Sequence, residues 1–423
     1  MPKAPYSQQK EARQQNSSLL LRDLWRNAPL SKAMLAQRNG LTKATVSAIS
    51  RDLAAMDLIR EVGQDRSGVG RPGGLLELNP LARCAVGVEI STNYCAVVLT
   101  DLCGELLWQD SVLIAIGSDL EAVLSQAEAL VAAASVQARE RGIPLLGIGV
   151  AVPGIVTPGP ESLVSAPALG WKEVNLKQIW ETRFNLTVVV DNKARAAAMA
   201  EALHGSAQGA SSFVYLSLGT DVSPSIEAAV IADGLPYRGA RGMAVDAGHM
   251  ILDAHGPLCP CGQHGCWQAM ADVRREVELI LPRLTAGEPS VLQAYLAEDG
   301  ATLDHRAIHQ AALEGDRLAL EVVSEVNSSH TLGLINLVRL YDPEMVVIGW
   351  ASSALPEAFL TRMKALIAIP ELDVPAAVLR YLSQREIVPP RIVYATHLKD
   401  ACTLGAAALI VDDFLRKPPT EEI

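Results

Sequence analysis

Aromatic residues are scarce in this sequence, and long apolar runs are missing from it. Only 4% of the 423 residues are aromatic although 49% are hydrophobic, so aliphatic side chains must fill the core. No run of about 18 apolar residues occurs, which speaks against a membrane-spanning helix. The polar residues 1–18 also lack the apolar stretch of a secretory signal. We therefore expect a cytoplasmic protein that does not act at a membrane.

Cysteine is also sparse, and its placement speaks against a disulfide framework. The chain has seven cysteines, an odd number, and three of them lie within residues 259–266. Disulfide scaffolds use paired cysteines along a small secreted chain. The clustering therefore favours a reducing compartment and a metal site.

Positive charge is confined to one end of the chain. The net charge is −11, yet residues 1–75 carry 12 basic and 6 acidic side chains, a net of +6, which leaves −17 for the remainder. A basic segment on an acidic body suits nucleic-acid contact by that segment alone. The length of the chain indicates two or three domains.

The basic segment has the pattern of a helix-turn-helix. Residues 17–28 place leucines and a tryptophan on one face of a predicted helix. Ser31 is a candidate N-cap for a second helix over residues 32–38, which Asn39-Gly40 closes, and Thr42 caps a third over residues 43–56. Two short helices joined by a tight glycine-containing turn predict a DNA-binding unit.

The last of these helices carries small or basic side chains that could enter a major groove. The candidate DNA-binding residues of the motif are Ser31, Thr42, Lys43, Thr45, Ser47 and Ser50. Residues 58–62 and 75–78 alternate like the two strands of a wing. The glycine-rich segment between them contains Arg66 and Arg71, which we expect to lie along a minor groove. The alternatives are an ordinary helical hairpin with a basic surface and a segment that is only a linker.

From residue 85 onward the pattern alternates between strands and helices. Residues 85–90 and 95–100 are predicted strands, and a similar pair recurs within residues 213–231. A duplicated unit of this kind predicts a two-lobed α/β architecture. Further predicted elements are helices at 121–141, 193–204, 318–339 and 404–415 and a strand at 345–349.

These patterns divide the chain into three expected parts. The first is a winged helix-turn-helix with its linker over residues 1–78. The second is a first lobe over residues 79–190 and 397–423. The third is a second lobe over residues 191–396, which contains the cysteine cluster.

The cysteine cluster is the most specific motif of the sequence. Three thiolates and one imidazole complete a four-coordinate zinc ion and leave no open position for catalysis. The predicted ligands of this structural Zn²⁺ are His249, Cys259, Cys261 and Cys266. His255 and His264 are competing nitrogen donors, and the other alternative is three ordinary buried cysteines. The glycines and prolines of the loop offer no core in which to bury them.

This motif and two flanking stretches resemble the ROK family of repressors, open reading frames and sugar kinases. The segment from Leu235-Pro-Tyr-Arg-Gly239 to Cys266-Trp267, and Leu41-Thr-Lys-Ala-Thr-Val-Ser47, are most similar to its xylose-repressor branch. The resemblance covers about residues 16–415. It implies a winged helix-turn-helix followed by a two-lobed actin-like, sugar-kinase-like α/β domain, assembled as a homodimer or tetramer. It also implies repression of sugar genes at double-stranded operator DNA and a sugar effector bound between the lobes.

The residues aligned with the family's kinase machinery depart from it. The family's phosphate loops, Asp-x-Gly-Gly-Thr and Gly-Thr-Gly-x-Gly, correspond here to Glu89-Ile-Ser-Thr-Asn93 and Gly219-Thr-Asp-Val-Ser-Pro-Ser225, and a third glycine pair to Gly349-Trp350. Glycine lets backbone N–H groups approach phosphates closely. Lys193 replaces the catalytic aspartate, and a protonated lysine cannot accept a hydroxyl proton. We therefore expect no catalytic residue and no enzyme activity.

The family's sugar-binding positions are altered less thoroughly. Ala168 replaces an asparagine, while Asp246 and Gln268 replace two glutamates; Asn192 and His249 match. The candidate ligand-binding residues are Asn192, Asp246, His249 and Gln268. The alternative is a cleft that remains only as scaffold.

Together these features predict a sequence-specific DNA-binding repressor, and the resemblance implies that it controls sugar-utilisation genes, with xylose or glucose as the first candidate effectors. Two alternatives stay open. One is a sugar kinase with a regulatory DNA-binding head, which the lost glycines and Lys193 disfavour. The other is a ligand-independent DNA-binding protein controlled by a partner protein.

Overall fold

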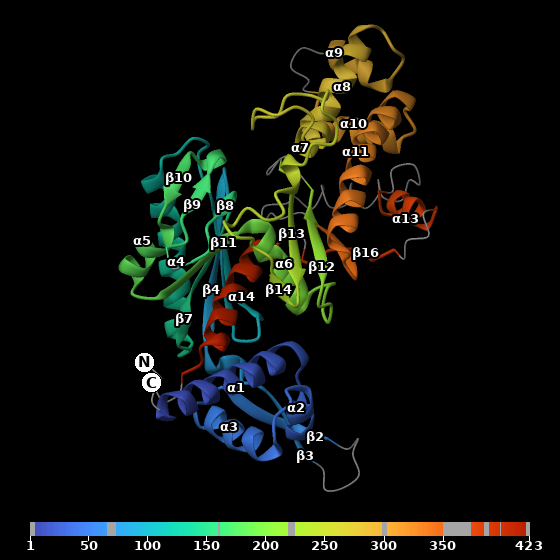
Figure 1. Cartoon of the computed structure of the whole chain (residues 1–423). Helices are drawn as coiled ribbons and strands as arrows, with labels where there is room; N and C mark the ends of the chain where they lie inside the picture. Colours follow the sequence, from blue (N-terminus) through green and yellow to red (C-terminus); the bar gives the residue numbers. More distant parts are fainter. Residues whose placement is uncertain are drawn as a thin grey trace. The chain divides into compact units, whose positions relative to one another are not determined.

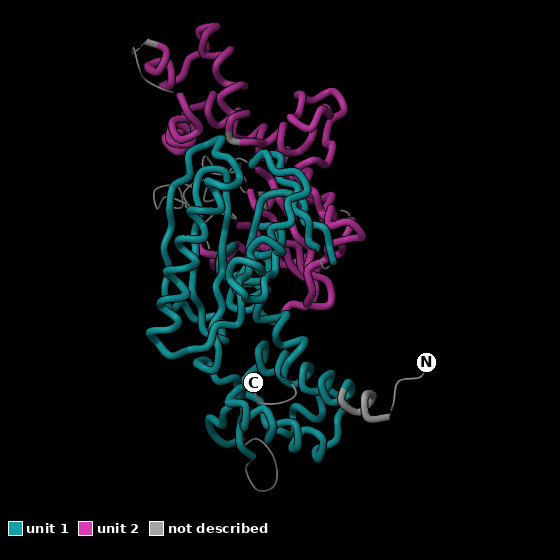
Figure 2. The backbone as a smooth tube through the Cα atoms, turned by 90° about the vertical axis from the view of Figure 1, so that its left-hand side faces the viewer, with its two compact units in different colours: residues 1–209, 401–423 teal, residues 210–400 magenta. Residues whose placement is uncertain are grey.

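The structure is a computed structural model that describes residues 5–65, 73–159, 161–218, 225–297, 303–349, 374–384, 389–397 and 399–419 (Figure 1). Contacts divide the chain into two compact units (Figure 2). Unit 1 comprises residues 1–209 and 401–423, and unit 2 comprises residues 210–400.

The first 78 residues, which we call the head, form in their described part three helices and a three-stranded antiparallel sheet in the order β1-β3-β2. The helices are α1 (Pro5–Asn27), α2 (Lys32–Arg38) and α3 (Lys43–Ala55), and the strands are β1 (Leu30–Ser31), β2 (Ile59–Asp65) and β3 (Gly73–Leu78). Ser31 caps α2 by accepting the Met34 N–H, and Thr42 caps α3 by accepting the Thr45 N–H. Both predicted N-caps are thus confirmed, because each hydroxyl satisfies a backbone donor of the first helical turn.

The rest of unit 1 contains a five-stranded sheet in the order β11-β7-β4-β5-β6. Its strands are β4 (Cys84–Ile90), β5 (Tyr94–Asp101), β6 (Leu106–Leu113), β7 (Leu145–Val152) and β11 (Thr187–Asn192). The helices are α4 (Leu120–Glu140), α5 (Leu176–Phe184), α6 (Lys193–His204) and α14 (Ala401–Arg416). A small sheet consists of β8 (Ile155–Val156), β9 (Val164–Ala166) and β10 (Trp171–Val174). Two 3-10 turns are η1 (Pro80–Ala82) and η2 (Pro167–Leu169).

Unit 2 contains a second five-stranded sheet in the order β14-β13-β12-β15-β16. Its strands are β12 (Phe213–Ser217), β13 (Glu227–Ala232), β14 (Leu235–Pro236), β15 (Met345–Gly349) and β16 (Arg391–Tyr394). The helices are η3 (Ala247–His249), α7 (Trp267–Ala271), α8 (Val273–Thr285), η4 (Val291–Gln293), α9 (Ala294–Ala297), α10 (His305–Leu313), α11 (Arg317–Tyr341) and α13 (Val374–Gln384). In both sheets the central strand pairs antiparallel with the next strand of the chain and parallel with a later one. The duplicated unit predicted from the sequence is therefore present.

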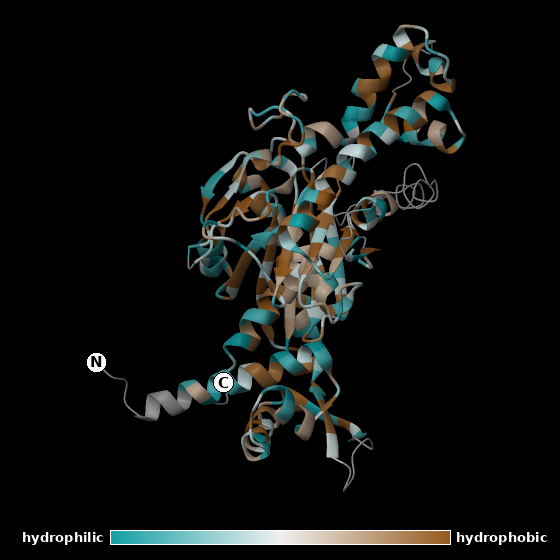
Figure 3. Ribbon diagram, turned by 45° about the vertical axis from the view of Figure 1, so that its right-hand side comes forward, coloured by the Kyte–Doolittle hydropathy of each residue, from teal (hydrophilic) through white to brown (hydrophobic). Residues whose placement is uncertain are grey.

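Hydrophobic residues concentrate on the strands and on the helix faces that cover them (Figure 3). The core is aliphatic, as the low aromatic content requires; the few large aromatics that are fully buried include Trp180, Trp267 and Phe213. Among the described helices, none combines the length and the apolar character needed to cross a bilayer.

Helix α14 joins the head to the sheet of unit 1. Three glycines allow its close approach: a Cβ on Gly149 would lie 1.7 Å from the Ala406 carbonyl oxygen, and one on Gly405 would lie 1.7 Å from that of Ala196. A Cβ on Gly87 would equally clash with backbone of α14. The far end of α14 shares one hydrophobic cluster with the head; its members include Leu20, Leu21, Leu24, Ile410, Val411 and Leu415.

This packing moves the domain boundaries expected from the sequence. The head was expected to end at residue 78 as a separate domain, and the second lobe to begin at residue 191. Because α6 and the head both pack against α14, they belong to unit 1, and the chain divides after residues 209 and 400.

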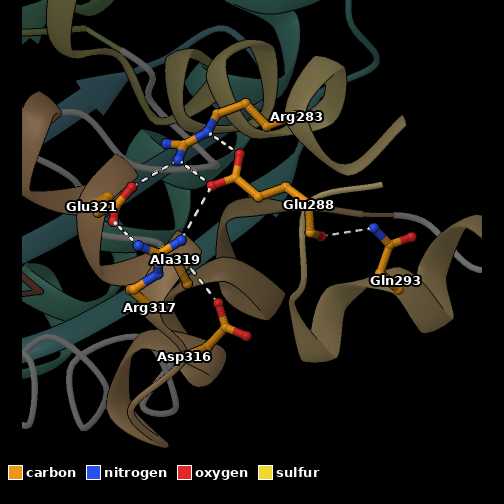
Figure 4. A network of polar contacts seen from close by, with 7 residues as sticks. All are labelled: Arg283, Glu288, Gln293, Asp316, Arg317, Ala319 and Glu321. Carbon is orange, nitrogen blue, oxygen red and sulfur yellow. Dashed lines mark hydrogen bonds and ion pairs between the residues drawn. The ribbon is translucent and has the colours of Figure 1, made fainter. Parts of the chain in front are cut away.

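Surface ion pairs connect the helices at one end of unit 2 (Figure 4). Arg283 at the end of α8 contacts Glu288 at 2.5 Å and Glu321 of α11 at 2.7 Å. Arg317 approaches the same two carboxylates. The hydrogen bond and charge of Arg283 lower the pKa of Glu288. Beneath this network, α8, α10 and α11 share a separate hydrophobic cluster.

Candidate DNA interface and metal centre

Helix α3 divides into a buried and an exposed face. Its buried residues are Val46, Ile49, Ser50 and Leu53. Within residues 43–51, the exposed or partly exposed side chains opposite them, which we call the outward face of α3, are Lys43, Ala44, Ser47, Ala48 and Arg51; the exposed Ala54 and Ala55 follow at the end of the helix. Thr42 and Thr45 lie at the helix start, where their hydroxyl oxygens are 2.8 Å apart. Lys43 and Ser47 are therefore accessible, whereas the Thr42 and Thr45 hydroxyls take part in the cap.

Two of the expected DNA contacts lie on the wrong side of the motif. Ser50 is only 3% exposed because it follows Val46 by four residues and precedes Leu53 by three, the spacing of one helix face. Ser31 is also 3% exposed, and its hydroxyl caps α2. The expectation that these two serines face DNA is therefore wrong. Arg66 and Arg71 lie outside the described residues.

Most described arginines of the head are neutralised by acidic partners. Arg38 pairs with Asp23 at 2.9 Å, and Arg60 pairs with Glu77 at 2.7 Å. Further pairs join α1 to α3 and to α14: Arg13 with Asp52, and Arg22 with Asp412 at 3.4 Å. On the described parts of α2 and α3, the cations without an acidic partner are Lys32, Lys43 and Arg51. The available positive charge of the motif therefore lies on these two helices.

The four predicted metal ligands converge in unit 2. The nitrogen of His249 and the sulfurs of Cys259, Cys261 and Cys266 all lie within 4.8 Å of one another. Sγ of Cys259 is 3.6 Å from Nδ1 of His249, and Sγ of Cys261 is 3.6 Å from Sγ of Cys266. A tetrahedral zinc with bonds of about 2.0–2.3 Å has edges of about 3.3–3.8 Å, so the two spacings of 3.6 Å fit the ion. His264 instead contacts the Gly256 carbonyl, 3.0 Å away.

The cysteine loop is held by its own backbone and by the core beside it. A backbone N–H at Gln263 lowers the pKa of the Cys261 thiol, while burial raises that of Cys266 to about 12. A bound cation would favour the thiolate form of both. Trp267, directly after Cys266, is fully buried against α11: its indole N–H donates to Nδ1 of His330, and a Cβ on Gly333 would lie 2.4 Å from the indole ring. The cysteine loop is thus anchored to the core of unit 2.

The expected sugar-binding residues fall in both units. Asn192 belongs to unit 1, where its Oδ1 caps α6 by accepting the Ala194 N–H and its Nδ2 donates to the Gly154 carbonyl. In unit 2, Asp246 precedes the short turn η3 and His249 is its last residue, and both are exposed. Oε1 of Gln268 would lie 3.2 Å from a Cβ on Gly248, so Gln268 lies beside that turn. Asp246, His249 and Gln268 are therefore neighbours, while the side chain of Asn192 is already engaged.

Lys193 has a buried partner that sequence reasoning did not identify. Its Nζ lies 2.8 Å from Oε1 of Glu89, and the two side chains are 1% and 0% exposed. Tyr94 donates its hydroxyl to the same carboxylate, and Ser91 Oγ lies 3.4 Å from Nζ. The sequence contained a signal: Glu89 and Lys193 have opposite charges, and the family resemblance was expected to place both at positions of its kinase machinery.

Comparisons with known proteins agree on one family. A profile described as the ROK family matches residues 85–413. A xylose repressor from Caldicellulosiruptor bescii is 30% identical over 411 residues, which are 96% of this chain and 98% of the relative.

Solved structures show the same fold. A ROK family transcriptional regulator, a homologue of the E. coli MLC protein, has a TM-score of 0.77 at 23% identity and covers 96% of this chain and 97% of its own. A ROK family glucokinase from Streptomyces griseus, in complex with glucose and AMPPNP, has a TM-score of 0.60 at 28% identity and covers 77% of this chain and 98% of its own. The kinase therefore matches a smaller share of this chain than the regulator does.

Proposed function

Because the chain belongs to the ROK family, we propose that it is a sequence-specific DNA-binding repressor of sugar-utilisation genes. In this proposal the head binds operator DNA, and a sugar bound in the actin-like, non-catalytic part releases it. The observation that carries the proposal is the placement of the unpaired cations Lys32, Lys43 and Arg51 on α2 and α3. A relative named a xylose repressor matches this chain over nearly its full length, head included.

The head acts as a winged helix-turn-helix. Helices α2 and α3 are joined by a turn through Gly40, whose φ of +63° suits glycine. In such motifs the N-terminal residues of the second helix contact base edges in the major groove, which assigns Lys43 and Ser47 to the bases. Strands β2 and β3 form the wing. We further propose that the chain binds a palindromic operator as a homodimer, so that two heads meet two half-sites.

The cysteine cluster holds one structural zinc. His249, Cys259, Cys261 and Cys266 supply three sulfurs and one nitrogen, the donor set of closed four-coordinate sites. When bound, the ion supplies no chemistry beyond fixing the loop, because four protein ligands leave no open position. With Nδ1 of His249 directed to the cluster, Nε2 remains for a sugar hydroxyl beside Asp246 and Gln268.

The chain does not transfer phosphate. A general base must accept the proton of the attacking hydroxyl, and Lys193 at that position is a cation paired with buried Glu89. Glu89 also corresponds to the first residue of the family's first phosphate loop, so the ion pair with Lys193 stands where that loop would begin. Similarity to a ROK glucokinase keeps a kinase as the second candidate; ATP turnover with any of a panel of sugars would favour it.

The function is tested by DNA binding of the full chain. Random duplexes that the protein retains should yield a palindromic operator, whose affinity falls as salt rises. Lys43→Ala should weaken operator binding, whereas Lys172→Ala should not, because Lys172 is an exposed lysine of the lobe. Failure to enrich any sequence, or an unchanged affinity of Lys43→Ala, would contradict the proposal.

A further inference from the structure

The outward face of α3 contains few groups that can hydrogen-bond to bases. Lys43, Ser47 and Arg51 are polar, and the remaining two members, Ala44 and Ala48, present methyl groups to solvent. The Thr42 and Thr45 hydroxyls, which could otherwise read bases, are 2.8 Å apart and bonded within the cap. Base recognition by this helix must therefore depend strongly on non-polar contact.

The outward face of α3 carries two cations that are available to DNA phosphates. Neither Lys43 nor Arg51 has an acidic partner among the described residues, although four other arginines of the head do. Lys43 and Arg51 are eight residues apart, about 12 Å along the helix axis. The two alanines lie between them in sequence, so cations stand at both ends of the methyl groups.

The spacing of the alanines matches successive bases. Ala44 and Ala48 are four residues apart on one helix face, about 6 Å along the axis, and two base steps measure about 7 Å. The one apolar group that a major groove displays is the thymine 5-methyl, for which alanine is a suitable partner. Alanine also lets the helix backbone approach the bases closely.

We propose that Ala44 and Ala48 recognise thymine methyl groups in the operator, while Lys43 and Arg51 hold α3 in the groove. This inference rests on the proposed DNA-binding function and adds the bases that are read and a contact, Arg51, that lies one turn beyond Ser47. It assigns thymines to each half-site at the positions that face α3.

A methyl scan of the operator tests the inference. The duplex selected from random sequences by the full chain is resynthesised with deoxyuridine in place of each thymidine in turn, which removes only the 5-methyl. Burial of one methyl group corresponds to about a four-fold change in affinity, so we expect about that loss at one or two thymines of each half-site.

Variants then assign the methyl groups to residues. In Ala44→Gly or Ala48→Gly, deoxyuridine at the corresponding position should cost no further affinity. Ala132→Gly, which changes an exposed alanine of α4, should keep the full sensitivity and controls for the lower helix propensity of glycine. Arg51→Ala should reduce the slope of log affinity against log salt by about one, whereas Arg139→Ala, an exposed arginine of α4, should leave it unchanged.

The outcomes separate the two proposals. A selected operator without half-site thymines, a flat methyl scan, or a deoxyuridine effect that persists in both glycine variants would overturn the inference and leave the DNA-binding function in place. Failure to select any operator would overturn the function and the inference with it.

Discussion

Lys193 begins helix α6, where the helix dipole disfavours a cation. The side chain is also almost completely buried, so its charge needs a partner inside the protein. Glu89 provides that partner at 2.8 Å, and the Tyr94 hydroxyl donates to the same carboxylate. The pair explains how a lysine can be buried at the start of α6 without unfolding the lobe.

Removal of one partner should therefore cost more than removal of both. Lys193→Met leaves the Glu89 carboxylate buried without its cation, and we expect a loss of about 3–5 kcal/mol in the free energy of unfolding. Glu89→Gln combined with Lys193→Met removes both charges and keeps an acceptor for Tyr94, so most of the loss should be recovered. Urea unfolding of the two variants measures this, and equal destabilisation would contradict the buried pair.

His330 is a second buried titratable residue whose environment fixes its charge state. It accepts a hydrogen bond at Nδ1 from the Trp267 indole, so the proton of the neutral ring is on Nε2. Burial lowers its pKa from 6.5 to about 4. An unfolded chain takes up this proton near pH 6.5 and the folded chain only near pH 4. Acid therefore favours unfolding within that window, and the effect saturates below it.

His330 should make the stability of the protein depend on pH. Between pH 6.5 and 4, His330 should account for a loss of up to about 3 kcal/mol. His330→Asn keeps an acceptor for Trp267 but does not titrate, so its unfolding midpoint should fall less steeply over this range than that of the unchanged protein. Parallel curves for the two proteins would show that His330 is not neutral and buried as described.

The cysteine loop contributes three of the four candidate ligands of the proposed zinc. Backbone hydrogen bonds close it, such as Cys259 N–H to the Gln263 carbonyl at 2.8 Å, but only Cys259 and Cys266 of its three cysteines are buried. Few apolar side chains hold the remainder. Through Trp267 and α11, any loosening of this loop reaches the core of unit 2.

Zinc should therefore stabilise the protein. Elemental analysis should find about one zinc per chain, and a chelator should lower the melting temperature. Cys261→Ser should lower it similarly and remove the further effect of the chelator. Cys103→Ser, which changes a half-buried cysteine outside the cluster, should retain both the metal and the response to chelator. A metal-free protein with an unchanged melting temperature would contradict the site.

The sequence predicts an element well where neighbouring residues determine it, and poorly where contacts between residues distant in the sequence determine it. Helix α2 agrees with its prediction at both ends because Ser31 and the Asn39-Gly40 turn are local signals. Ser50 was misplaced because a small polar residue fits either helix face, and only the packing of α3 decides between them. The contacts place α6 in unit 1, on the other side of the expected break, for a similar reason. Gly149 of β7 contacts Ala406, and Gly405 of α14 contacts Ala196 of α6. These close contacts join residues more than 200 positions apart in the sequence.

At the scale of the whole molecule, the head cannot be treated as an independent module. Its leucines share a hydrophobic cluster with α14, and Arg22 of α1 pairs with Asp412 of that helix. Helix α14 in turn packs on α6, whose first turn contains Lys193 and is capped by Asn192. Within unit 1, a continuous series of packed elements therefore connects Asn192, an expected sugar-binding residue, with α2 and α3, the helices proposed to bind DNA.

A neutral sugar should lower operator affinity without being phosphorylated. A sugar changes DNA binding only if it binds the DNA-competent and released forms with different affinities, and a tenfold effect needs about 1.4 kcal/mol of coupling. By linkage, operator DNA should weaken sugar binding by the same factor. Operator complexes titrated with xylose, glucose and a panel of larger sugars measure the effect. Asp246→Ala should abolish the response and leave the affinity for DNA alone intact, because Asp246 is exposed beside His249 and remote in sequence from the head. If no sugar alters operator affinity, control by a partner protein becomes the better hypothesis. ATP turnover with any of these sugars would instead favour the hypothesis that the chain is a sugar kinase.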